Sequence, residues 1–146
     1  MEKYNEEIIR LYEAANAFGD LLDMQLTLVD QGVVTYSMEV KPYHLATPFA
    51  AHGGALAALV DGAVGVAALS KVSINKKVVS TVELKMNFLR PAVLGDVLLA
   101  KGNVVSAGNR LLYVECEVMN QIGDLIAKAS GTFNAYPAEK AFGRPF

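Results

Sequence analysis

The sequence has a single cysteine, Cys116, among 146 residues, so no disulfide can form within the chain. This fits a reducing compartment, and we expect a cytoplasmic protein. The formal net charge of −2 provides no general attraction to nucleic acid or to an anionic membrane surface, and we expect neither as a partner. The amino terminus, MEKYNEEIIRLYEAA, lacks the basic and then apolar layout of a signal peptide.

The sequence also lacks a long run of strongly hydrophobic residues, although one segment comes close. Between His52 and Lys71 stand 18 residues with one charge, which is near the length of a membrane span. The segment consists mostly of Ala, Gly and Val, and Asp61 near its centre would cost about 2.5–3.5 kcal/mol on insertion. We therefore predict no membrane span, and we interpret the segment as a helix buried inside the protein.

Apolar residues are nevertheless abundant. They make up 53% of the sequence, the mean hydropathy is +0.30, and charged residues contribute only 19%. This is more apolar than an average soluble domain, so some of the excess must be buried, and a partner subunit is the simplest place for it. There is no internal repeat, low-complexity tract or linker, and the length suits one domain over residues 1–146.

The hydrophobic period divides the chain into elements. Residues 4–17 have helical spacing, and we expect Gly19 to end this helix. Residues 24–40 alternate around a turn at Val29–Gly32 and predict a hairpin, in which Met24, Leu26 and Leu28 share a face. A Pro-rich loop over 42–49 precedes the buried helix, predicted over residues 54–69. Four alternating segments follow, which predict strands over 80–88, 97–106, 112–118 and 125–133.

The order of these elements predicts the architecture. Connections between strands are short, so neighbouring strands can pair antiparallel, while the helical link can join strands that are not adjacent. Each strand offers one apolar face, whereas the central helix is apolar on all sides. We therefore predict an α+β fold in which a curved antiparallel sheet of about six strands wraps around one long buried helix.

Several motifs give this chain a family resemblance. His52-Gly53-Gly54 is followed by six residues and then Asp61, all on the predicted buried helix after the Pro-rich loop. The run TVELKMNFLRPA over 81–92, then Gly95-Asp96, Gly108-Asn109-Arg110 and Gly123, completes the pattern. Over roughly residues 20 to 136 the sequence resembles the hotdog-fold acyl-CoA thioesterases, most of all the phenylacetate-pathway (PaaI-type) group. The resemblance implies hydrolysis of acyl-CoA without metal or organic cofactor, by homodimers that often pair into homotetramers.

The spacing of His52 and Asp61 bears on how a site could be built. At about 100° per residue, nine residues place them on nearly opposite sides of one helix and roughly 13 Å apart along its axis. They cannot serve one small reaction centre within one chain. A two-fold axis could bring Asp61 of one subunit to the helix start of the other, so a joint role for the two requires a shared site. The resemblance implies the same arrangement.

The chemistry of thioester hydrolysis suggests roles for these residues. The carbonyl oxygen gains negative charge when attacked, and a helix start offers unpaired N–H groups and a positive dipole end. Gly53 and Gly54 allow close approach of a ligand, and the family pattern implies the Gly53 amide as oxyanion donor. Asp61 would be a general base acting on water or a nucleophile forming a mixed anhydride. His52 would orient the substrate or take part in catalysis, or it would only position the loop.

Other candidate residues have weaker support. Thr81 matches a position where some family members hold a Ser or Thr near the attacking water, although strict alternation places it on the polar strand face with Glu83. Arg90 and Arg110 suit the phosphates of CoA. The family often has Asn or Gln six residues before the His of HGG, whereas this chain has Ala46. Thr47 either replaces that group in substrate binding, or the site is tuned differently.

We therefore predict an acyl-CoA thioesterase. The alternative is a non-catalytic hotdog protein that binds an acyl-CoA or another apolar ligand, and a hotdog dehydratase or dehalogenating thioesterase is a third hypothesis. Asp61 also has a simple structural interpretation, as a side chain that binds a neighbouring loop. His44 and Cys116 are interpreted as locally packed and core residues.

Overall fold

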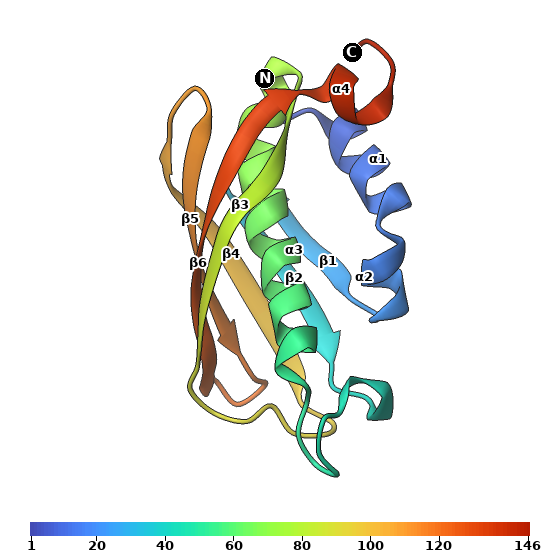
Figure 1. Ribbon diagram of the computed structural model, residues 1–146, viewed down its shortest axis with the longest axis vertical. Coiled ribbons are helices and arrows are strands. Elements are labelled where there is room, and N and C mark those ends of the chain that lie inside the picture. Colours follow the sequence, from blue (N-terminus) through green and yellow to red (C-terminus); the bar gives the residue numbers. More distant parts are fainter.

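The computed structural model describes residues 1–146 (Figure 1). Its helices are α1 (Glu6–Ala15), α2 (Ala17–Leu21), α3 (Gly53–Val72) and α4 (Ala138–Phe142). Its strands are β1 (Gln25–Asp30), β2 (Val33–Glu39), β3 (Lys77–Phe88), β4 (Val97–Ala107), β5 (Leu111–Met119) and β6 (Leu125–Pro137). Short 3-10 turns occupy Pro42–His44 and Ser73–Asn75.

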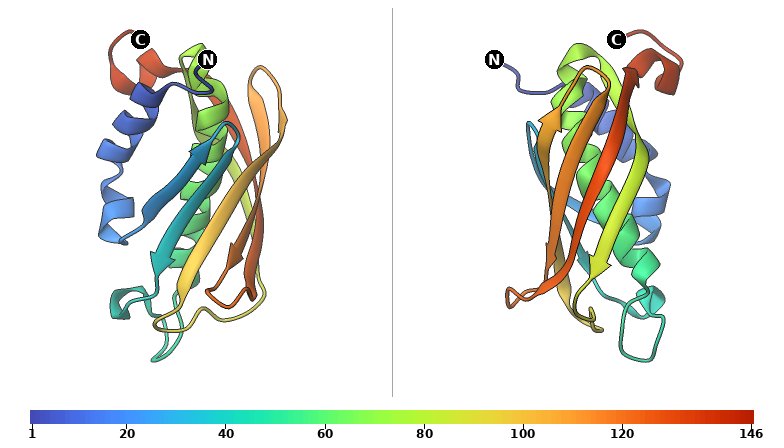
Figure 2. Two further views of the ribbon diagram at one scale, coloured as in Figure 1. Left: turned by 180° about the vertical axis from the view of Figure 1, so that it is seen from behind. Right: turned by 60° about the vertical axis from the view of Figure 1, so that its left-hand side comes forward.

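The six strands form one antiparallel sheet in the order β1-β2-β4-β5-β6-β3. Helix α3 connects β2 to β3, which lies at the far edge of the sheet, so the helical link joins strands that are not neighbours. Figures 1 and 2 show the sheet curving around α3, with α1 and α2 on the opposite side of that helix from β3 to β6. The predicted α+β class, six-stranded sheet and central helix are confirmed.

Helix α3 contributes more residues to the core than any other element. Thirteen of its 20 residues are buried, within one cluster of 32 buried hydrophobic residues contributed by the helices and the inner face of the sheet. The segment Gly53–Asn75 is long and apolar enough to cross a membrane, but 72% of its most apolar window is buried inside the protein. Its hydrophobicity is thus used in packing against the sheet.

A glycine allows the helix to approach the sheet closely. A Cβ built on Gly102 of β4 would lie 2.6 Å from the carbonyl oxygen of Ala63 in α3, which is shorter than real Cβ contacts. Any side chain at this position would separate the two layers, because the obstacle is helix backbone rather than a movable side chain. Gly102 therefore sets the distance between α3 and β4.

Helix α3 is not covered on every side, contrary to the prediction. Its less buried residues recur at three- and four-residue spacing and form one stripe: Gly54, Ala57, Ala58, Asp61 and Gly65. Asp61 is only half-buried in a single chain. The sheet wraps around the helix but does not close over this stripe, which leaves its polar residue accessible.

Three local predictions were wrong, each for a reason that alternation alone does not reveal. The first helix ends at Ala15, before Gly19, because the Asn16 side chain accepts a hydrogen bond from the Gly19 N–H (3.1 Å) and starts α2. A bulge between Leu26 and Leu28 turns Leu28 outward, where it is 49% exposed. A second bulge, between Thr81 and Glu83, reverses the faces of Ser80 and Thr81.

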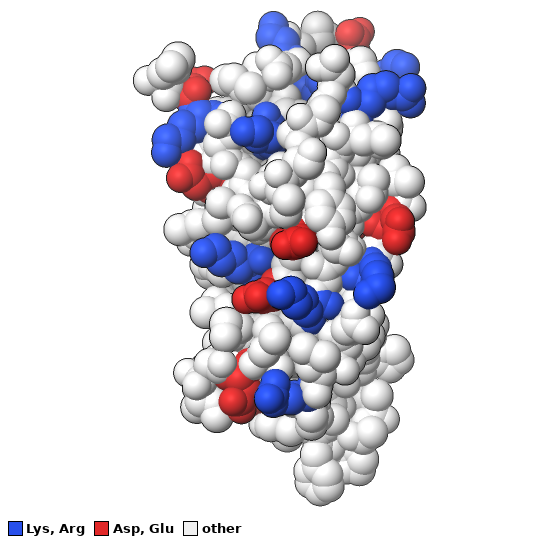
Figure 3. Space-filling model, turned by 90° about the vertical axis from the view of Figure 1, so that its left-hand side faces the viewer, with Lys and Arg blue, Asp and Glu red and all other residues white.

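The outer face of the sheet carries charges of both signs. Figure 3 shows basic and acidic side chains interleaved across this face. Lys128 of β6 and Glu117 of β5 form an exposed ion pair there, with 3.4 Å between Nζ and Oε1. The residues that concern function lie instead on the inner side of the sheet, along α3 and β3.

Candidate active site

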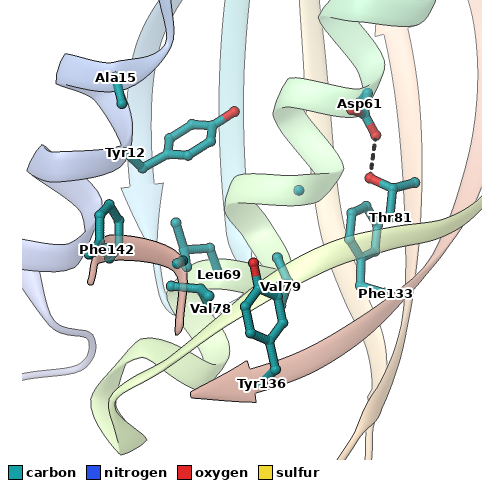
Figure 4. A pocket seen from close by; sticks show the side chains of 12 residues that line it. Tyr12, Ala15, Asp61, Leu69, Val78, Val79, Thr81, Phe133, Tyr136 and Phe142 are labelled. Atoms are coloured by element: carbon teal, nitrogen blue, oxygen red, sulfur yellow. Dashed lines mark hydrogen bonds between the residues drawn. The ribbon is translucent and has the colours of Figure 1, made fainter. Parts of the chain in front are cut away.

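Asp61 and Thr81 form a direct contact between the central helix and the edge strand. The Thr81 hydroxyl donates a hydrogen bond to Oδ1 of Asp61 over 2.9 Å (Figure 4). Thr81 pairs with the buried Phe133 of β6, so it points toward the helix. The predicted placement of Thr81 beside Glu83 on the polar face is therefore wrong. The bulge at Val82 moves the hydroxyl to the same side as the carboxylate.

A cavity of about 280 Å³ opens beside this pair. Asp61 and Thr81 lie at one end, and the remaining walls are largely apolar, with Leu69, Val79 and Phe133 among them. Figure 4 shows Tyr12 of α1 and Tyr136 of β6 reaching into the same space. A mostly apolar cavity with a few polar groups at one end is the usual form of a small-molecule site.

Tyr12 belongs to the electrostatic environment of Asp61. Burial raises the pKa of the Tyr12 hydroxyl, and the negative charge of Asp61 raises it further, because both disfavour a phenolate. The hydroxyl therefore stays protonated at neutral pH and is a hydrogen-bond donor in the cavity.

The start of α3 offers one free backbone donor. His52 is the N-cap, and its Nδ1 accepts a hydrogen bond from the Gly54 N–H over 2.7 Å. No hydrogen bond uses the Gly53 N–H, which points out of the first turn. Of the two glycine N–H groups, only that of Gly53 is available to an incoming oxygen atom. The Gly54 N–H is already bonded, so Gly54 contributes only the absence of a side chain, which allows a ligand to approach the backbone.

The loop that carries this helix start is held firmly. The Ala51 N–H donates to the carbonyl of Ala92 (2.8 Å), and the His52 N–H donates to that of His44 (2.7 Å). The His44 ring is buried, accepts from the Lys41 N–H at Nδ1 (2.9 Å) and contacts the Leu22 carbonyl oxygen through Nε2 (2.7 Å). Both ring nitrogens of His44 are thus occupied by local structure, as expected for a packed residue.

One chain contains two separate parts of the predicted site. Gly53 and Asp61 lie eight residues apart on α3, or roughly 12 Å along its axis. Beside Gly53 is Phe88, at the end of β3, whose Cζ would be 3.4 Å from a Cβ at that position. Asp61 instead contacts Thr81, near the middle of the same strand. The two parts follow one edge strand but do not meet within one chain.

The other predicted residues lie at different distances from these parts. Arg90 lines an open groove together with Gly53 and Phe88, and its Nη1 donates to the Leu125 carbonyl (2.9 Å). Arg110 lies in the β4–β5 turn, where its carbonyl accepts from the Ala135 N–H, near the opposite end of β6. The Thr47 hydroxyl oxygen accepts from the Ala50 N–H (3.0 Å) and stabilises a loop turn, while Ala46 adds no polar group.

Sequence reasoning missed the far wall of the cavity. Tyr12 lies in the helix predicted over residues 4–17, and neither Tyr12 nor Phe142 is predicted to belong to the site. Both line the cavity with Asp61. Tyr12 and Tyr136 have a feature that can be recognised in the sequence, a polar group on an otherwise apolar face. Nothing in the sequence indicates that the two ends of the chain meet.

Comparison with known proteins identifies the family to which the chain belongs. A model of the thioesterase superfamily matches residues 50–127, a stretch that contains Gly53, Asp61, Thr81 and Arg90. A putative esterase of Archaeoglobus fulgidus is 31% identical over 113 residues, which cover 77% of this chain and 71% of that protein.

Solved structures share the fold. The PaaI protein from the phenylacetic acid degradation operon of E. coli superposes with a TM-score of 0.83 at 24% identity, covering 89% of this chain and 91% of that one. The smu.793 protein of Streptococcus mutans, solved bound to acetyl CoA, superposes with a TM-score of 0.72 at 28% identity, covering 78% and 89%. The predicted hotdog fold and family resemblance are confirmed.

Proposed function

The chain belongs to the thioesterase superfamily, a family of thioester hydrolases, and from this membership we propose that it is an acyl-CoA thioesterase that works as a homodimer. Asp61 and Thr81 of one subunit would supply one half of each site, and Gly53 of the partner subunit would supply the other. The observation that carries the proposal is the Asp61–Thr81 hydrogen bond at the mouth of a mostly apolar cavity.

The free edge of β3 supports the dimer. Strand β3 is an edge strand of the sheet. Exposed apolar side chains lie along it and just after its end: Val82 is 62%, Phe88 54% and Leu89 50% exposed. An unpaired strand edge is a template for pairing with another chain. If two β3 strands pair antiparallel about a two-fold axis, with Thr81 opposite Phe88 of the partner subunit, each Asp61 faces the partner subunit's Gly53.

The reaction follows from this pairing. The thioester carbonyl oxygen would accept a hydrogen bond from the free Gly53 N–H at the positive end of α3. Asp61 would take a proton from water as the water oxygen attacks the carbonyl carbon, or it would attack that carbon itself and form an anhydride that water then hydrolyses. In either route the C–S bond breaks and CoA leaves as a thiolate, which takes up the proton held by Asp61 in the first route or a proton from solvent water in the second, with the acid as second product.

The dimer also relates the arginines to the substrate. Arg90 shares a groove with Gly53. Arg110 lies next to the half of β6 that pairs with the Thr81 region of β3. Pairing through β3 brings these two regions, from different subunits, toward one site, where guanidinium groups suit CoA phosphates. His52 would orient the helix start through its bond to Gly54. A tetramer of two such dimers and a cytoplasmic location stay predictions.

One observation favours the alternative of a non-catalytic acyl-CoA binder. The family often holds an Asn or Gln at the position of Ala46, and the hydroxyl oxygen of Thr47 is engaged by the Ala50 N–H. Thr47 therefore does not reproduce an amide that could hold water or the substrate carbonyl. Turnover decides between the two functions.

The test is release of free CoA thiol from a panel of acyl-CoAs by the wild-type protein and by Asp61→Asn. We expect hydrolysis of at least one acyl-CoA and a loss of kcat of about 100- to 10,000-fold in Asp61→Asn. The matched control is Asp20→Asn on the exposed helix α2, which should hydrolyse like the wild type. Micromolar binding of CoA esters without turnover of any would establish the binder instead.

A further inference from the structure

We propose that Tyr12 of α1 and Phe142 of α4 form the end wall of the acyl pocket and limit the substrates to compact acyl groups. This inference rests on the proposed function, because it places the acyl group in the cavity beside Asp61. Both residues lie outside the family-matched residues 50–127. The reacting groups and the size selection would thus reside in different parts of the chain.

The order of residues along the cavity supports this assignment. Asp61 and Thr81 mark the reacting end, and Figure 4 shows Phe142 on the opposite side of the space, beyond the Tyr12 ring. A thioester whose carbonyl lies at Asp61 would point its acyl group along Leu69 and Val79 toward these two aromatic rings. The CoA part would extend in the other direction, toward the open β3 edge.

The wall is fixed by contacts between the two ends of the chain. Arg144, just after α4, forms an ion pair with Glu7 of α1. The same guanidinium lies 4.6 Å from the centre of the Phe146 ring, which packs edge-on against Phe142 with 5.4 Å between ring centroids. These contacts link α4 and the residues after it to α1, and they fix the position of Phe142 at the end of the cavity.

The volume of the cavity gives the substrate class. An apolar cavity of about 150 Å³ holds one benzene ring, so about 280 Å³ holds one substituted ring or a straight chain of about six to eight carbons. A chain of twelve or more carbons would collide with Phe142. The substrates would be CoA esters of single-ring or short-chain acids.

Two substitutions change the cavity in opposite directions. Phe142→Ala removes a ring from the end wall. Gly65→Ala adds a methyl group to the cavity on the Asp61 face of α3, where a Cβ would meet only Phe133 Cε1, at 3.6 Å. Because Gly65→Ala suits a helix, it also tests the inference if Phe142→Ala fails to fold.

The experiment measures kcat/KM for straight-chain acyl-CoAs from C2 to C16 and for benzoyl- and phenylacetyl-CoA. We expect the wild type to favour compact substrates. The ratio of kcat/KM for dodecanoyl-CoA to that for hexanoyl-CoA should rise about tenfold or more in Phe142→Ala, and the ratio for octanoyl-CoA to acetyl-CoA should fall about tenfold in Gly65→Ala. Phe18→Ala, which changes a 62% exposed phenylalanine of α2, is the matched control and should leave the profile unchanged.

Binding to Asp61→Asn separates this inference from the proposed function. Dissociation constants for the same acyl-CoAs should show the same size limit, again shifted by Phe142→Ala and Gly65→Ala. A size limit in binding without turnover by the wild type would contradict the enzyme and support the pocket. Turnover by the wild type with a profile that neither substitution moves would overturn the pocket and leave the enzyme in place.

Discussion

The hydroxyl of Thr81 lies 2.9 Å from Oδ1 of Asp61 and joins the edge strand β3 to the central helix. This contact exists because a bulge at Val82 shifts the register of β3 on β6. With regular alternation, Thr81 would face the outer surface of the sheet. A single extra strand residue therefore places a hydrogen-bond donor on the carboxylate.

We expect this hydrogen bond to matter for activity. Thr81→Val keeps the side-chain shape but removes the donor, and a hydrogen bond to a charged group contributes about 1.5–3 kcal/mol, so kcat/KM should fall about 10- to 100-fold. Thr81→Ser retains the hydroxyl and should keep most of the activity. Full activity of Thr81→Val together with a loss of activity in Thr81→Ser would show that the methyl group, rather than the donor, is what counts.

The Gly53 amide can be tested by removing its N–H without removing the helix. Proline is well tolerated at the first helical position, and His52 already has the extended conformation (φ −63°, ψ 135°) that precedes proline. Gly53→Pro should therefore fold and lose about 100- to 1,000-fold in kcat. Gly53→Ala keeps the N–H and is the matched control for the added bulk. Full activity of the proline variant would exclude this amide as the oxyanion donor.

A shared site predicts complementation between two inactive chains. In dimers mixed from Asp61→Asn and Gly53→Pro subunits, one of the two sites combines a native Asp61 with a native Gly53. Random association should restore about one quarter of the wild-type activity. Steady-state assays after co-expression measure this recovery, with each variant alone as the baseline. A mixture no more active than its components would indicate that each site is built from one chain.

Two Gly→Ala substitutions should change stability in opposite directions. Gly102→Ala forces a methyl group to within 2.6 Å of the Ala63 carbonyl oxygen and should lower the free energy of unfolding by about 1–3 kcal/mol. Gly65→Ala should raise it by about 0.4–1 kcal/mol, because it restricts the unfolded chain and meets no backbone. Denaturant titration followed by circular dichroism measures both. A stabilising Gly102→Ala would contradict the close packing of α3 on β4.

The single cysteine should be unreactive in the folded protein. Cys116 is 1% exposed, and burial raises the pKa of its thiol to about 12, so the thiolate that reacts with disulfide reagents is scarce at neutral pH. We expect labelling by a chromogenic disulfide reagent at pH 8 only when the protein is unfolded, with guanidinium-denatured protein as the positive control. Rapid labelling of the native protein would show that β5 opens readily.

The sequence by itself predicted the central helix, the antiparallel sheet and the residues Gly53 and Asp61. The predictions of the helix and the sheet are confirmed, because each depends on the local periodicity of the sequence, whereas the roles of Gly53 and Asp61 stay predictions. The helical spacing of His52 and Asp61 predicts that, if the two residues act together, their site is shared between subunits, and this stays a prediction. The alternation that predicts a strand over residues 80–88 is regular from Leu84 to Phe88, where Leu84, Met86 and Phe88 share the inner face of β3.

Only the tertiary structure decided which groups surround Asp61. The bulge at Val82 arises from the register between β3 and β6, whose paired residues lie far apart in the sequence. The Gly53 N–H is free because the His52 side chain accepts its hydrogen bond from the Gly54 N–H and not from that of Gly53. The wall of Tyr12 and Phe142 depends on contacts between the two ends of the chain. Side-chain periodicity describes one element at a time, whereas a cavity is defined by how several elements pack.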